Sequence, residues 1–310
     1  MDSPQTPQQQ PARMNFLNRI TDHPVITKEL KGRMRGKQGF IILGAYLSFI
    51  SFFISLIYIL IVSESSTTIG DPSFLQTVGK VIFSTVVLLE LLMLAFIGPA
   101  LTAGAISSER EHRTLDLLKT SLLSPRSLVF GKLSSAVAFL FLLIFTGLPV
   151  ESLAFFLGGV GAEEMIVSTL MLVVTAVFFC TLGLFFSSIS QRTLLSTVFS
   201  YATILLSFIL FIFLLFIIGT LGAINARNIV TENILTTATW FLLSLNPFFA
   251  AVVSEVILID EQSLWLTSSN LFGTTSFPLP SPWIIYVTFN LLLSTILIAL
   301  SINFVKRTDR

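Results

Sequence analysis

The sequence predicts an all-α integral membrane protein with about six transmembrane helices. Of its 310 residues, 54% are hydrophobic and only 11% are charged, whereas soluble domains carry about 25% charged residues. Three long segments contain no Asp, Glu, Lys or Arg, namely 38–63, 165–191 and 262–305. A helix of about 20 apolar residues crosses the hydrocarbon core and satisfies its own backbone hydrogen bonds there. These observations favour membrane-spanning helices over a water-soluble core.

The expected spans cover residues 40–62, 81–105, 129–150, 165–187, 197–222 and 284–304. They form a transmembrane domain over 39–310, which follows a disordered cytoplasmic tail at 1–22 and an interfacial amphipathic helix at 23–38. If both termini are cytoplasmic, 16 of the 18 Lys and Arg residues lie on the inner side, and only Lys80 and Arg227 lie outside. The positive-inside rule favours this orientation.

The apolar segment 236–259 is expected to form two short helices, either re-entrant or at the outer face, followed by the Pro-rich turn FPLPSPW. A seventh crossing would place the basic C-terminus outside, against the positive-inside rule. Asn246-Pro247 would break a spanning helix near its centre, and Glu255 would lie within the membrane. The sequence therefore favours six spans.

A dense group of charges stands between the second and third spans, in ISSEREHRTLDLLKTSLLSPRSLVFGKL at 106–133. Ser108 and Glu111 have the spacing of a capping box, which predicts a helix outside the membrane over 109–120. One apolar stripe is expected on this helix, formed by Leu115, Leu118 and Leu122. The interleaved charges leave two interpretations open: an ordinary interfacial loop helix or a surface that docks onto another protein.

The stretch LTAGAISSEREHRTLDLLKTSLLSPRSLVFGKL resembles the cytoplasmic segment of type-2 ABC exporter permeases. Its parts Ser108–Leu118, Ser124–Ser127 and Gly131-Lys132 stand where that family has its charged run, its S-P-x-S and its G-K. HPVITKELKGRMRGK resembles the family's N-terminal interfacial helix, with His23 in place of the usual Asn. The resemblance implies six spans with both ends inside, and a coupling helix from Glu109 to about Thr120 that docks into a separate ATPase.

The resemblance implies a permease subunit of an ATP-driven exporter that forms the translocation path in a bacterial or archaeal plasma membrane. It also implies a second permease subunit, identical or related, and an ABC ATPase subunit that binds ATP and Mg. No nucleic acid, metal, cofactor or catalytic residue is expected in this chain. ATP hydrolysis is expected in a separate subunit, because GRMRGK lacks the spacing and the Ser/Thr of a phosphate loop. The residues expected to couple to the ATPase are Ser108, Glu109, Arg110, Glu111, His112, Arg113, Thr114, Leu115, Leu118 and Leu122.

The interfacial helix at 23–38 has two possible roles. Its basic residues can hold anionic lipid, or the helix can act as a transmission element that also touches the ATPase. The residues expected to serve this helix are Pro24, Lys28, Glu29, Lys31, Arg33 and Arg35.

Glu90 is the only charged residue deep within an expected span. Such a carboxylate is costly in a membrane and is therefore a functional candidate, although a structural role is left open; Asn290 is a weaker polar candidate. The alternative function is an ion-coupled secondary transporter that uses Glu90, but such proteins need several buried charges. An intramembrane enzyme is disfavoured, because His23 and His112 are cytoplasmic and Glu90 has no carboxylate partner on another expected span. The single Cys180 excludes a disulfide within the chain.

Overall fold

The computed structural model describes residues 37–64, 72–114, 124–225, 229–261, 265–269 and 277–307. Within them, six helices are long and apolar enough to cross a membrane, which confirms the expected number. They are α3 (Lys37–Glu64), α4 (Pro72–Thr102), α7 (Pro125–Phe156), α8 (Ala162–Ile189), α9 (Thr193–Asn225) and α12 (Pro282–Arg307). The tail at 1–22 and residues 23–36 of the expected interfacial helix lie outside the described residues.

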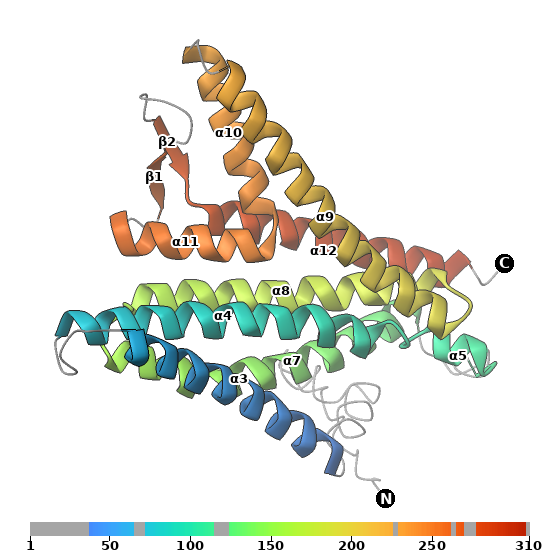
Figure 1. Cartoon of the computed structure of the whole chain (residues 1–310). Helices are drawn as coiled ribbons and strands as arrows, with labels where there is room; N and C mark the ends of the chain where they lie inside the picture. The colour runs from blue at the N-terminus through green and yellow to red at the C-terminus, as the bar shows by residue number, and fades with distance from the viewer. Residues whose placement is uncertain are drawn as a thin grey trace, which may run out of the picture.

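Helices α4, α7 and α8 lie side by side, and α12 packs along α8 (Figure 1). Glycines bring α4 and α8 close together. A Cβ atom on Gly98 of α4 would lie 2.9 Å from the Cβ atom of Phe179, and one on Gly183 of α8 would lie 3.0 Å from the Cα atom of Pro99. Small residues at helix contacts permit this approach in membranes, where van der Waals packing drives association.

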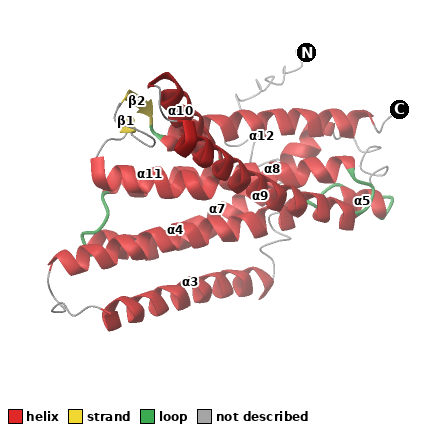
Figure 2. Cartoon of the chain, turned by 45° about the horizontal axis from the view of Figure 1, so that its top comes forward, coloured by secondary structure: helices red, strands yellow, loops and turns green. Residues whose placement is uncertain are grey.

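Helices α3 and α9 flank this bundle and slant away from it (Figures 1 and 2). Many apolar side chains of α9 are exposed, among them Leu194 and Phe216, which are 72% and 68% exposed. A groove of about 940 Å³ has a mainly apolar lining from α4, α8, α9 and α12, together with residues 245–248. The exposed faces are consistent with contact to lipid or to another membrane subunit, because neither requires polar side chains.

Two shorter helices, α10 (Ile229–Leu245) and α11 (Pro247–Glu261), follow α9, and the chain bends by 113° between them. The break lies at Asn246, whose Oδ1 atom accepts a hydrogen bond from the backbone N–H of Phe248 at 3.0 Å. Pro247 is the first residue of α11, where a backbone N–H would have no partner within the helix, so the missing N–H of proline costs nothing. The prediction of two short helices that meet at Asn246-Pro247 is confirmed, and their re-entrant or outer-face position stays a prediction.

A β-hairpin that the sequence did not predict joins α11 to α12. Its strands β1 (Leu266–Ser269) and β2 (Phe277–Pro280) pair antiparallel, with Leu266 opposite Pro280. Both strands are sheet edges, so the prolines of β2 can turn their nitrogens away from the partner strand. The indole N–H of Trp240 donates to the carbonyl of Pro280 at 2.8 Å, which ties the hairpin to α10.

Candidate functional site

The charged segment begins directly at the C-terminal end of α4. After a turn at 103–106 the chain forms the short helix α5 (Ser107–Glu111). The N–H groups of Ile106 and Ser107 both donate to the hydroxyl of Ser187 on α8, at 2.9 and 3.0 Å. A hydroxyl from a neighbouring helix thus satisfies the N–H groups of the N-cap residue and of the first residue of α5, which have no partner within that helix.

The capping box predicted from Ser108 is wrong. The helix begins at Ser107, two residues earlier than expected, and the N–H of Ser108 already bonds to the carbonyl of Gly104 at 3.1 Å. The N-cap position is occupied by Ile106, which has no side chain that can cap. The pattern of Ser108 and Glu111 was correct for a helix start, but the hydroxyl of Ser187 from α8 takes the capping role.

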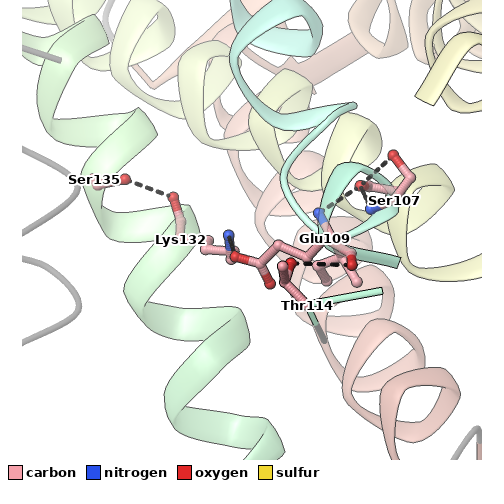
Figure 3. A network of polar contacts seen from close by, with 7 residues as sticks. Ser107, Glu109, Thr114, Lys132 and Ser135 are labelled. Carbon is pink, nitrogen blue, oxygen red and sulfur yellow. Dashed lines mark hydrogen bonds and ion pairs between the residues drawn. The ribbon is translucent and has the colours of Figure 1, made fainter. Parts of the chain in front are cut away.

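Glu109 connects α5 to α7. Its Oε1 atom lies 2.6 Å from the Nζ atom of Lys132, and the lysine side chain is only 5% exposed whereas that of Glu109 is 22% exposed (Figure 3). A buried ammonium group requires a compensating negative charge. Lys132 is the lysine of the G-K pair in the sequence motif, and the structure assigns it this ion pair.

Arg110 connects α5 to the end of α8. Its guanidinium donates to the carbonyls of Ser188 and Ser190 at 3.1 and 3.0 Å, with a longer bond to Ile189 at 3.4 Å. The last carbonyls of a helix have no partner within that helix, and the negative end of the helix dipole lies there. A guanidinium with several donors is therefore well matched to this site.

Glu111 connects α5 to the start of α9. Its Oε2 atom accepts bonds from the backbone N–H and the hydroxyl of Thr193, at 3.1 and 2.9 Å. Thr193 is the first residue of α9. A carboxylate at the positive end of a helix satisfies free N–H groups and interacts favourably with the helix dipole.

The helix expected over 109–120 ends at Glu111. Arg113 has a φ of 56°, in the left-handed region that non-glycine residues seldom adopt. The N–H of Arg113 bonds to the carbonyl of Arg110 and the N–H of Thr114 to that of Glu109, at 3.1 and 2.9 Å. These two bonds form a Schellman motif, which terminates a helix. The expected stripe Leu115, Leu118 and Leu122 lies outside the described residues.

The three described residues that follow α5, at 112–114, are exposed. Glu111, His112, Arg113 and Thr114 are all exposed, whereas Ser107 is fully buried. Glu109, Arg110 and Glu111 already have partners on α7, α8 and α9 within this chain. The charged segment therefore has two parts: an inner part that binds three helices, and a tip at 112–114 that is presented to the surroundings.

The two intramembrane candidates are not neighbours in any described contact. Glu90 on α4 is 1% exposed and accepts a hydrogen bond from the hydroxyl of Tyr46 at 2.7 Å. It also lies within hydrogen-bonding reach of Glu151, so the expectation that it lacks a carboxylate partner is wrong. The reason is that α7 continues to Phe156, beyond the expected end at 150. Asn290 on α12 is buried, lines the groove and bonds to the carbonyl of Tyr286 in its own helix.

A comparison with protein families decides the assignment. A family model described as "ABC-2 family transporter protein" matches residues 23–305, which is nearly the whole chain. The chain belongs to the ABC-2 transporter family. No match to a curated protein was found.

The ABC-2 assignment makes the chain a multi-pass membrane permease and not the ATPase of the transporter. It decides against the alternative of an ion-coupled secondary transporter. The family match also covers the charged segment at 106–133, so the resemblance inferred from the motifs there is confirmed at the level of the family.

Several residues of the permease's inner site escaped sequence reasoning. Ser187 and Thr193 are ordinary polar residues at span ends, and nothing local marks them as partners of α5. Lys132 was visible as part of the G-K pair, and a lysine followed by a long apolar run is a signal for a buried ion pair. Its partner Glu109 could be found only once the fold placed α5 beside α7.

Proposed function

We propose that this ABC-2 permease is the membrane subunit of an ATP-driven exporter, and that the tip at 112–114 contacts a separate ATPase subunit. The observation that carries the proposal is the division of the charged segment. Three consecutive charged residues fix α5 to three spanning helices, and the next residues are exposed. A surface that must transmit force needs both a firm attachment and a free contact face.

The attachment explains how movement at the tip would reach the spans. Arg110 holds the end of α8 and Glu111 holds the start of α9, so α5 bridges the turn between these two helices. Glu109 adds the start of α7 through Lys132. A displacement of α5 would therefore shift the inner ends of α7, α8 and α9 together. Transport requires that the ATP cycle favours two arrangements of these helices differentially.

The remaining partners follow from the family. Two permease subunits, identical or related, would face each other across the path, with two ATPase subunits bound beneath them and both chain termini of each permease in the cytoplasm. The membrane would be the plasma membrane of a bacterium or archaeon. The ATPase subunits would bind ATP and Mg, and the interfacial segment with Lys28 and Arg33 would hold anionic lipid, the ATPase, or both.

The test changes Arg113, because its backbone conformation bears on stability and its side chain bears on ATPase binding. Arg113→Gly removes the guanidinium but suits the left-handed backbone, so the free energy of unfolding should rise by about 1 kcal/mol. If the guanidinium pairs with a charged group of the ATPase, its loss removes a contact that contributes ~2 kcal/mol to binding. The affinity for the ATPase should then fall by at least about 30-fold. The measurements are the melting temperature of the purified permease and the amount of ATPase that co-purifies with it.

The matched control is Arg126→Gly. Arg126 is also exposed and lies near the start of α7, but it belongs to a regular helix. This variant should bind the ATPase normally and lose about 1 kcal/mol of stability, because glycine is a poor helix former. Unchanged ATPase binding and unchanged ATP-driven transport in Arg113→Gly would show that the tip is a solvated loop, and the coupling proposal would fail.

A further inference from the structure

A second cluster of polar groups lies within the membrane-spanning bundle, far along α4 from α5. It joins three helices: Tyr46 on α3, Glu90 on α4 and Glu151 on α7. The Tyr46 hydroxyl donates to Oε1 of Glu90 at 2.7 Å, and the carboxyl groups of Glu90 and Glu151 lie within hydrogen-bonding reach of each other. Each glutamate is only 1% exposed.

Gly147 makes room for this cluster on α7. A Cβ atom there would overlap Oε1 of Glu90 and lie 2.9 Å from the hydroxyl oxygen of Tyr46. The Glu90 carboxyl group therefore rests directly against the backbone of α7. Glu151 stands one helical turn further along, so it projects from the same face of α7 as Gly147. The two acidic groups are thus held together by the shape of the helix contact.

The hydrogen bonds of the cluster are incomplete. Oε2 of Glu90 and both carboxyl oxygens of Glu151 are buried and accept no bond from a donor in the described part of the chain. The titratable groups that act on Glu90 are Tyr46 from α3 and Glu151 from α7, and Glu90 from α4 acts on Glu151. Among the described residues, no Lys, Arg or His of α8, α9, α11 or α12 donates a hydrogen bond to either carboxyl group.

Two carboxylates cannot both stay ionised in such a site. An isolated buried carboxylate is very costly, and a second negative charge beside it adds repulsion. The single hydroxyl proton of Tyr46 serves only one of the four carboxyl oxygens. One further proton, placed between the carboxyl groups, removes a charge and supplies the missing donor at the same time.

We propose that Glu90 and Glu151 form a proton-binding site, and that one proton shared by their carboxyl groups holds α3, α4 and α7 together. With the proton bound, one carboxyl donates its O–H to the other, and Tyr46 donates to Glu90 from α3. When the proton leaves to solvent, both groups carry negative charge and repel each other across the contact between α4 and α7. The close burial of both side chains suits a proton better than a larger cation.

The proposal predicts a pH dependence with a definite sign. The folded protein holds the proton, whereas solvent-exposed carboxyl groups in the unfolded chain have a pKa of about 4.3 and are therefore ionised at neutral pH. Unfolding therefore releases a proton, and stability falls as pH rises, with the unfolding constant increasing about tenfold per pH unit over the range where the folded site stays protonated. The protonated carboxyl group also has a C=O stretch that infrared spectroscopy detects.

The experiment compares the purified full chain with Glu90→Gln/Glu151→Gln. Infrared difference spectra between the two should contain a carboxylic acid band at neutral pH that disappears at alkaline pH. The melting temperature of the wild type should fall with rising pH up to the range in which the band disappears and then level off, and that of the double variant should fall less. Glu163→Gln, which changes an exposed carboxylate at the start of α8, should retain both the band and the pH dependence.

A single variant guards against misfolding of the double variant. In Glu151→Gln the side-chain amide donates to Glu90 in place of the shared proton, so this variant should stay folded at alkaline pH better than the wild type. The proposal is overturned if the difference spectrum shows no carboxylic acid band. It is equally overturned if Glu151→Gln and the wild type lose stability in parallel as pH rises.

Discussion

At the inner end of α4, three consecutive charged side chains each bind a different helix. Glu109 pairs with Lys132 of α7, Arg110 caps the end of α8, and Glu111 caps the start of α9. A surface ion pair contributes little to stability, but the pair of Glu109 and Lys132 is largely buried. The buried charge of Lys132 is tolerated because Glu109 compensates it.

The pair of Glu109 and Lys132 can be tested by a double-mutant cycle. Glu109→Gln removes the carboxylate beside a buried ammonium group and should lower the free energy of unfolding by about 1–3 kcal/mol. Adding Lys132→Met removes the charge that needs compensation, so the double variant should be destabilised by less than the sum of the single variants. The measurement is thermal or denaturant unfolding of all four proteins in the same detergent. Strictly additive losses would mean that the two side chains do not interact.

Sequence reasoning at the residue scale found the charges but not their partners. The run from Ser108 to Thr114 stood out because its surroundings are apolar, and the family motif gave it a place. Its hydrogen bonds depend on which helix ends meet at the inner face, and that arrangement is long-range. Arg113 shows the limit clearly: nothing in its residue type indicates a left-handed backbone, since glycine is usual there.

At the scale of elements, apolar length was a sufficient guide to the spans, because each crossing needs a fixed length of helix. Their ends were harder to predict. The helix α7 extends past 150 to Phe156 and carries Glu151 with it, and an acidic residue beyond the apolar run gave no sign that the helix continues. The β-hairpin was missed because prolines in β2 disfavour a strand assignment.

The contact between α4 and α8 gives a prediction for this scale. Gly183→Ala should be destabilising by about 1–3 kcal/mol, because the added methyl group meets Thr102 and lies 3.0 Å from the Cα atom of Pro99. Gly44→Ala on α3 is the matched control, since a Cβ there meets nothing within 4 Å. Alanine is the better helix former, so this control should be neutral or slightly stabilising. Equal melting temperatures for both variants would show that α4 and α8 do not pack this closely.

At the scale of the whole molecule, the permease combines a packed bundle with two exposed helices. The bundle of α4, α7, α8 and α12 has the closest contacts, and α5 lies at one end of it (Figure 1). The slanted helices α3 and α9 present apolar faces outward, where lipid or the second permease would lie. The proposed ATPase contact would then act through α5, which is bonded to α7 and α8 of the bundle and to the flanking helix α9.

The most direct test of this account is a photo-crosslinking measurement at the tip of the charged segment. A photoreactive amino acid placed at Arg113 in cells that produce the whole transporter should yield a crosslinked product. Mass spectrometry should identify its second component as an ATPase with a GxxxxGK[ST] loop. The same probe at Phe156, an exposed residue at the opposite end of the bundle, should give no such product. Crosslinking of the ATPase from Phe156 and not from Arg113 would contradict both the orientation of the chain and the role of the tip.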